Sequence, residues 1–143
     1  MHKILIITSM VVMFGFGCKK REVKDQGLLE YKWVLNYIQD TRNNEVINYP
    51  GDAARKITIV FDDSSGIISF KGICNDGSGS YSFTSIAGEI KITNMMTTLI
   101  GCKYVEWETY TVQNLYYATG YKINGDNLTI YSTGEYNLYF TKS

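Results

Sequence analysis

Apolar residues recur at every second position in about eight short segments between residues 33 and 140. Successive side chains of a β-strand point to opposite faces of a sheet, so this spacing predicts strands with one buried face. The alternating sets are Trp33, Leu35 and Tyr37; Ile57, Ile59 and Phe61; Ile68 and Phe70; Tyr81 and Phe83; Ile90 and Ile92; Tyr121 and Ile123; Leu128 and Ile130; and Leu138 and Phe140. Turn-forming residues at 62–66, 124–127 and 132–135 predict hairpin connections.

One segment, residues 104–117, breaks this alternation. It contains no glycine or proline, and Tyr104, Trp107, Thr111 and Leu115 fall near one stripe of a helix. We therefore expect the only substantial helix of the chain here. A curved antiparallel sheet needs its open end or face covered, so the pattern predicts a mainly β fold: a small, partly closed antiparallel β-barrel covered by one α-helix.

The start of the chain has the organisation of a secretory signal. Lys3 precedes an apolar stretch at 4–16, and small residues then lead to Cys18. The stretch is shorter than the roughly 20 residues that cross a bilayer. We expect residues 1–17 to be a lipoprotein signal peptide and Cys18 to carry the lipid, although Gly15 stands where such signals usually have leucine. An ordinary signal peptide with an incidental cysteine is the alternative.

The predicted anchor sets the expected domain organisation and location. Acyl chains such as palmitate on Cys18 would hold the protein at a membrane. Residues 18–28 are mostly charged or polar and predict a flexible tether, and residues 29–143 suffice for a single domain. The expected location is the bacterial cell envelope, with the protein anchored in the outer membrane and facing the periplasm or the cell surface.

Composition excludes several classes of function. The chain has 14 Lys and Arg, 14 Asp and Glu, and one histidine, which lies in the predicted signal. Near-neutral charge offers no basic surface for nucleic acid, and a mature chain without histidine lacks Ser-His and Cys-His nucleophiles and the commoner zinc sites. Asp62 and Asp63 lie in a predicted turn, and Glu106 and Glu108 face different directions on the predicted helix. We expect all four carboxylates to be solvated, and neither an enzyme nor a cofactor.

The cysteines and a glycine-rich run carry the remaining candidate chemistry. Lipidation of Cys18 would leave Cys74 and Cys102 as a possible disulfide, worth about 3–4 kcal/mol. Two buried reduced thiols are the alternative, and a redox-active pair is not expected without Cys-x-x-Cys spacing. Residues 75–80, Asn-Asp-Gly-Ser-Gly-Ser, lack the closing glutamate of a calcium loop and the lysine of a phosphate loop. A flexible turn accounts for these glycines, and we expect no metal site.

Tyrosine is abundant: the chain has 12, and eight of them lie in its last third. Its ring supplies rigid amphipathic contact area for protein partners, although in a small barrel most such rings pack inward with the hydroxyl in water. The candidate partner-binding residues are Tyr116, Tyr117, Tyr131 and Tyr136.

Short motifs follow one another in a distinctive order along the domain. They are Trp33-x-Leu35; Ile57-x-Ile59-x-Phe61; Gly72-Ile73-Cys74-Asn75 with Gly79-x-Tyr81; Thr97-Thr98-Leu99-Ile100-Gly101-Cys102; Trp107-Glu108-x-Tyr110 with Leu115; and Tyr121-x-Ile123-x-Gly125-Asp126-x-Leu128-x-Ile130. This series, over residues 31–141, resembles the META domain, or HslJ-like, family. It departs from the family at Asp76-Gly77-Ser78, where a larger residue is common. The resemblance implies a helix-covered β-barrel of bacterial envelope proteins, with no agreed enzymatic activity.

Two functions remain open at this point. The first is a lipid-anchored, non-catalytic module that binds an envelope protein or component through exposed aromatic residues and supports envelope integrity or stress tolerance, as the resemblance implies. The second is a lipocalin-like carrier of a small apolar ligand. A carrier needs a dry cavity inside the barrel, whereas a packed barrel with apolar surface outside favours a partner.

Overall fold

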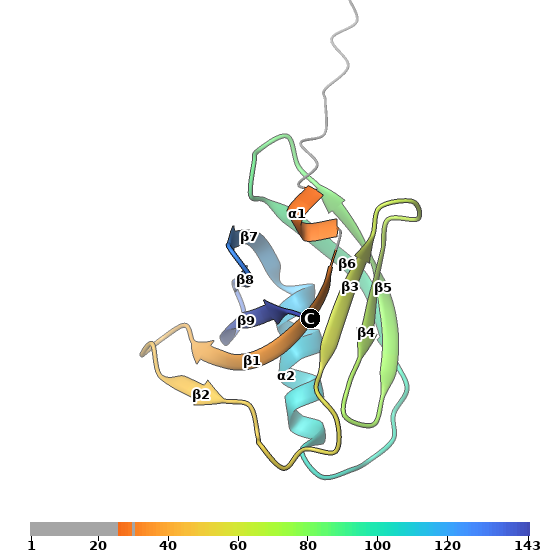
Figure 1. Ribbon diagram of the computed structural model, residues 1–143, viewed down its shortest axis with the longest axis vertical. Helices are drawn as coiled ribbons and strands as arrows, with labels where there is room; N and C mark the ends of the chain where they lie inside the picture. The colour runs from red at the N-terminus through yellow and green to blue at the C-terminus, as the bar shows by residue number, and fades with distance from the viewer. Residues whose placement is uncertain (1–25, 30) are drawn as a thin grey trace, which may run out of the picture.

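A computed structural model describes residues 26–29 and 31–143 of the chain, as a curled antiparallel sheet with a helix against it (Figure 1). The sheet follows the order β6-β5-β4-β3-β1-β9-β8-β7, and the short strand β2 pairs with β1 outside this path. The strands are β1 (Lys32–Asp40), β2 (Val46–Asn48), β3 (Thr58–Asp62), β4 (Ile67–Lys71), β5 (Asp76–Phe83), β6 (Ile90–Thr97), β7 (Ala118–Asn124), β8 (Asn127–Ser132) and β9 (Tyr136–Lys142). The helices are α1 (Gln26–Leu29) and α2 (Val105–Tyr116).

The two end strands of the sheet meet at a single bridge. Glu89, just before β6, pairs with Gly120 of β7, and the N–H of Tyr121 donates to the carbonyl oxygen of Gly88 at 2.8 Å. Further along β6 the neighbouring element is α2, which packs against that strand. The fold is therefore mainly β, an antiparallel half-barrel with a helix packed on it, which confirms the predicted fold class.

The interior of the half-barrel is filled by the alternating apolar residues. The predicted apolar sets of β4, β5, β6, β8 and β9 are buried, as are Ile59 and Phe61 of β3 and Ile57 just before it. The helical stripe of α2 adds Trp107, Thr111 and Leu115 to the buried interior. The three predicted hairpin segments join β3 to β4, β7 to β8 and β8 to β9. The largest fully buried side chains are Trp33, Phe61, Phe70 and Phe140.

Strand β1 departs from the predicted alternation at Tyr37. Trp33 and Leu35 are buried as expected, but the register against β9 shifts between Leu35 and Tyr37, so the next buried residue is Ile38. A β-bulge of this kind inserts one extra residue and moves the following side chains to the opposite face. Tyr37 therefore lies on the outer face, where its ring stacks on Tyr139 with centroids 4.4 Å apart.

The glycine-rich run after Cys74 forms most of strand β5. Our prediction of a flexible turn there was wrong. A Cβ atom on Gly77 would collide with the carbonyl oxygen of Met96, and one on Gly79 would collide with the sulfur of Met95. The glycines are needed because the β5 and β6 backbones approach closely beside a bulge in their pairing.

The domain includes residues that the sequence analysis gave to the tether. Leu28 of α1 is fully buried, and its carbonyl oxygen accepts a hydrogen bond of 3.0 Å from the indole N–H of Trp33. Residues 26–28 therefore belong to the folded unit. The predicted signal peptide, Cys18 and the tether up to residue 25 lie outside the described residues. In the part of the chain that is described, no helix is both long and apolar enough to span a bilayer.

Candidate functional site

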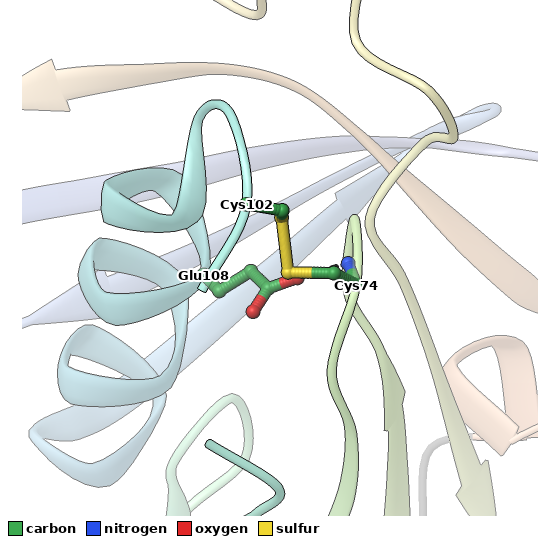
Figure 2. Close-up of side chains that lie close together, drawn as sticks. All are labelled: Cys74, Cys102 and Glu108. Atoms are coloured by element: carbon green, nitrogen blue, oxygen red, sulfur yellow. Dashed lines mark hydrogen bonds between the residues drawn. A yellow bond between two sulfur atoms is a disulfide. The ribbon is translucent and has the colours of Figure 1, made fainter. Parts of the chain in front are cut away.

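A disulfide joins the segment before β5 to the connection between β6 and α2. Cys74 and Cys102 are bonded, with their Cα atoms 6.4 Å apart, and both residues are half-buried (Figure 2). The predicted pairing is thus present in the structure. It ties the loop that precedes α2 to the sheet.

Glu108 extends from α2 toward Cys74 beside this disulfide (Figure 2). Its Oε1 accepts hydrogen bonds from the backbone N–H groups of Cys74 (2.6 Å) and Asn75 (3.0 Å), and its Oε2 accepts one from Nδ2 of Asn75 (2.6 Å). Only 4% of the residue is exposed, so our expectation of a solvated carboxylate was wrong for Glu108 and right for Glu106. The Glu108 carboxylate fits at this position because Gly72 has no side chain. A Cβ atom on residue 72 would collide with the carboxylate.

The position of Glu108 beside the buried face of the helix could have been predicted from its helical spacing. It lies three and seven residues before Thr111 and Leu115, so it borders the stripe that we predicted to be buried. A carboxylate at such a position is buried only when hydrogen-bond donors meet it. Those donors come from residues 74 and 75, more than 30 positions earlier, which no local pattern indicates.

Asn75 connects this carboxylate to the loop. Its Nδ2 also donates to the carbonyl oxygen of Ile100 (2.9 Å), while its Oδ1 accepts from the N–H of Ile100 (2.7 Å) and the hydroxyl of Thr98 (2.8 Å). The buried side chain thus uses both amide hydrogens and both oxygen lone pairs. We call Glu108, Asn75, Thr98 and Ile100 the Asn75 clasp. With the disulfide, it holds the loop at two points.

The loop held in this way exposes large apolar side chains. Leu99 is 96% exposed and Ile100 is 58% exposed. Beside them, a groove of about 620 Å³ runs between this loop and α2, with Val105 and Val112 on the helix side. Glu108 is the single ionisable residue of its lining, and both of its oxygens already accept hydrogen bonds. The groove therefore presents aliphatic, hydroxyl and amide groups.

The cysteines and Glu108 also form a cluster of metal-ligand type. Their Sγ and carboxylate oxygen atoms lie within 4.8 Å of one another. Metal ions bind cysteine as the thiolate, and the disulfide removes that form of both sulfurs. In the state described here, the cluster acts as a structural link between α2 and β5.

The four candidate tyrosines do not form one surface. Tyr116 and Tyr117 are exposed at the end of α2, with their rings edge to face and centroids 5.3 Å apart. Tyr136 is half-buried against Tyr110, at 5.1 Å between centroids. Tyr131 is exposed on β8, where it lines a separate cleft. The exposed pair Leu99 and Ile100, by contrast, lies within the motif at 97–102, which the sequence pattern did not indicate as a binding surface.

Comparisons with known proteins agree with the fold. A sequence model of the META domain matches residues 26–143. The fold is similar to an NMR structure of a protein from Burkholderia xenovorans, with a TM-score of 0.67 and 21% identity over 82% of this chain and 85% of that one. It is also similar to the crystal structure of a DUF4847 family protein from Bacteroides vulgatus, with a TM-score of 0.63 and 12% identity over 81% and 94% of the two chains. No curated protein sequence matches the chain.

Proposed function

We propose that this chain, which belongs to the META domain family, is a non-catalytic binding module that lipidated Cys18 holds at the bacterial cell envelope. Its binding site is the groove between α2 and the loop before it. The observation that carries this proposal is the exposure of Leu99 and Ile100 on a loop fixed by both a disulfide and the Asn75 clasp. Apolar side chains kept in water by an ordered backbone are typical of interaction sites.

The chemistry of the groove favours an extended peptide segment of an envelope protein. Leu99 and Val112 offer apolar contact, while the hydroxyl of Thr97 and the amide of Gln113 can bond to peptide groups. No lysine or arginine lines the groove, which disfavours a phosphorylated headgroup or another anion. An uncharged peptide segment can contact the apolar side chains of the groove and also form hydrogen bonds with its hydroxyl and amide groups.

The position of the groove suits a tethered protein. Figure 1 shows α1 near one end of the long axis and the first turn of α2 near the other. The proposed anchor precedes α1 in the sequence. The domain would then attach to the membrane at one end and present its groove at the opposite end.

The filled interior weakens the alternative of a lipocalin-like carrier. Such a protein needs an open apolar cavity inside its barrel. Trp33, Phe61 and Phe140, each no more than 1% exposed, instead pack into the half-barrel. The groove of about 620 Å³ lies outside this core, at the surface of α2.

The anchor is tested by the intact mass of protein extracted gently from membranes. The expected mass begins at Cys18 and includes acyl chains. A mass without acyl chains would overturn the anchor and leave the groove as a separate question.

The groove is tested by a photo-crosslinking residue placed at Leu99 in cells, with a matched control at Ile86. Ile86 is 59% exposed and lies in the turn between β5 and β6. We expect position 99 to form a discrete product with an envelope protein, and mass spectrometry to map the linked residue to an uncharged segment. Equal labelling at both positions would contradict a specific groove.

A further inference from the structure

A second cleft lies on the outer face of the sheet, where β1, β9, β8 and β7 run side by side. Its volume is about 250 Å³, and it shares no lining residue with the groove beside α2. Tyr37, Tyr131 and Tyr139 provide its aromatic wall. We call it the tyrosine cleft.

Two of these rings form a rigid platform. Tyr37 and Tyr139 are directly paired across β1 and β9, and their rings stack at 4.4 Å with an interplanar angle of 14°. The hydroxyl of Tyr139 donates to Oε1 of Gln39 at 2.7 Å, which fixes its ring further. Tyr131, 41% exposed on the neighbouring strand β8, adds a third ring. An aromatic surface already ordered by its neighbours loses little entropy when a ligand binds to it.

Apart from Phe140, the remaining lining of the cleft is polar and carries little charge. Asn36, Asn124 and Asn127 contribute side-chain amides, Thr129 a hydroxyl and Lys122 an ammonium group. No carboxylate is among the lining residues. Within the described part of the chain, the Oδ1 atoms of Asn36 and Asn127 accept no hydrogen bond, so both are available to a ligand.

We propose that the tyrosine cleft binds a saccharide. A sugar ring has an apolar C–H face that packs on an aromatic ring, and hydroxyl groups at its edge that both donate and accept hydrogen bonds. Amide side chains match those hydroxyls because each amide also donates and accepts. The small volume suits one or two sugar rings rather than a folded partner. This site is additional to the proposed peptide groove and does not depend on the lipid anchor.

The test is isothermal titration of the full mature protein in detergent micelles with two probes, chitotriose and maltotriose. We expect at least one trisaccharide to bind. Tyr131→Ala and Asn127→Ala should each weaken that binding by about tenfold, whereas Tyr131→Phe should retain most of it because the ring remains. The matched control is Tyr116→Ala, which removes an exposed tyrosine from the end of α2. An unchanged urea transition for Tyr131→Ala shows that the variant is folded.

Three results would overturn the inference. The first is the absence of heat with both trisaccharides at millimolar concentrations. The second is an equal loss in Tyr131→Ala and Tyr116→Ala, which would indicate nonspecific stacking. The third is a concentration-dependent dimer that Tyr131→Ala abolishes, because the cleft would then be covered by a second copy of the chain.

Discussion

Nδ2 of Asn75 lies 2.6 Å from Oε2 of Glu108, and both residues are buried beside the disulfide. The same amide nitrogen reaches the carbonyl oxygen of Ile100. One asparagine thus links α2, the start of β5 and the loop that borders the groove. The energetics of this link can be separated from those of the disulfide by mutation.

Replacing Glu108 by glutamine should destabilise the domain by about 2–3 kcal/mol. The new amide group presents an N–H toward donors at residues 74 and 75, and the charge that strengthens the other hydrogen bonds is lost. Urea denaturation measures the change. The matched control is Glu106→Gln on the exposed side of the same helix, expected within about 0.5 kcal/mol of the parent. Similar effects of the two substitutions would refute the clasp.

Replacing both Cys74 and Cys102 by serine should lower the free energy of unfolding by about 3–4 kcal/mol, because the unfolded chain regains the freedom of a long loop. The variant should still fold, since the Asn75 clasp holds the loop through other atoms. Adding a reductant should shift the urea midpoint of the parent protein and leave that of the variant unchanged. If the parent's thiols react with an alkylating agent before reduction, the bond is not formed.

Adding one methyl group at Gly77 should cost about 1–3 kcal/mol. The new Cβ would overlap the carbonyl oxygen of Met96, so β5 and β6 would have to separate. Gly51→Ala is the matched control, because a Cβ there meets nothing within 4 Å. Thermal unfolding of the two variants gives the comparison. A Gly77→Ala variant as stable as Gly51→Ala would show that this close approach carries no energetic weight.

Stability should fall between about pH 4 and pH 2 in part because of Asp40. The hydrogen bond from the Arg42 side chain, helped by the Arg42 backbone N–H, lowers the pKa of Asp40 from 3.8 to about 2. A carboxyl whose folded pKa is lowered stabilises the fold above its unfolded pKa and loses that contribution as pH falls toward the folded value. Asp40→Asn should therefore flatten the pH dependence of the unfolding free energy in this window.

The control for Asp40 is Arg42→Ala, which removes the side-chain donors and should flatten the same window in part. Urea transitions measured at intervals of pH provide the profile. An acid dependence of Asp40→Asn identical to that of the parent would show that other carboxyl groups account for the loss.

Local patterns were sufficient for most of the sheet and for the helix. Ile57, Ile59 and Phe61 occupy one buried face because alternation is a property of the extended backbone itself. The stripe of Trp107 and Leu115 follows in the same way from the helical period. These predictions needed no knowledge of what the element packs against.

The errors occurred where a residue's place depends on a distant partner. Tyr37 moved to the outer face because the pairing of β1 with β9 contains a bulge. Gly77 proved to be a point of close approach because β6 lies against it. Glycine permits a turn and a close contact equally well, so the residue type alone does not distinguish them.

The sequence by itself determined the mainly β class and the position of α2, because the period of apolar residues is a property of the chain. It left Cys74 and Cys102 as a possible pair, and the structure shows that they are bonded. The tertiary structure alone decided that Glu108 is buried, that Asn75 holds the loop before α2, and that Leu99 borders a groove. The first two depend on hydrogen bonds between segments more than 20 residues apart, and the third depends on how the loop before α2 lies against the helix. Such partners are brought together by the curvature of the sheet, which no local pattern encodes.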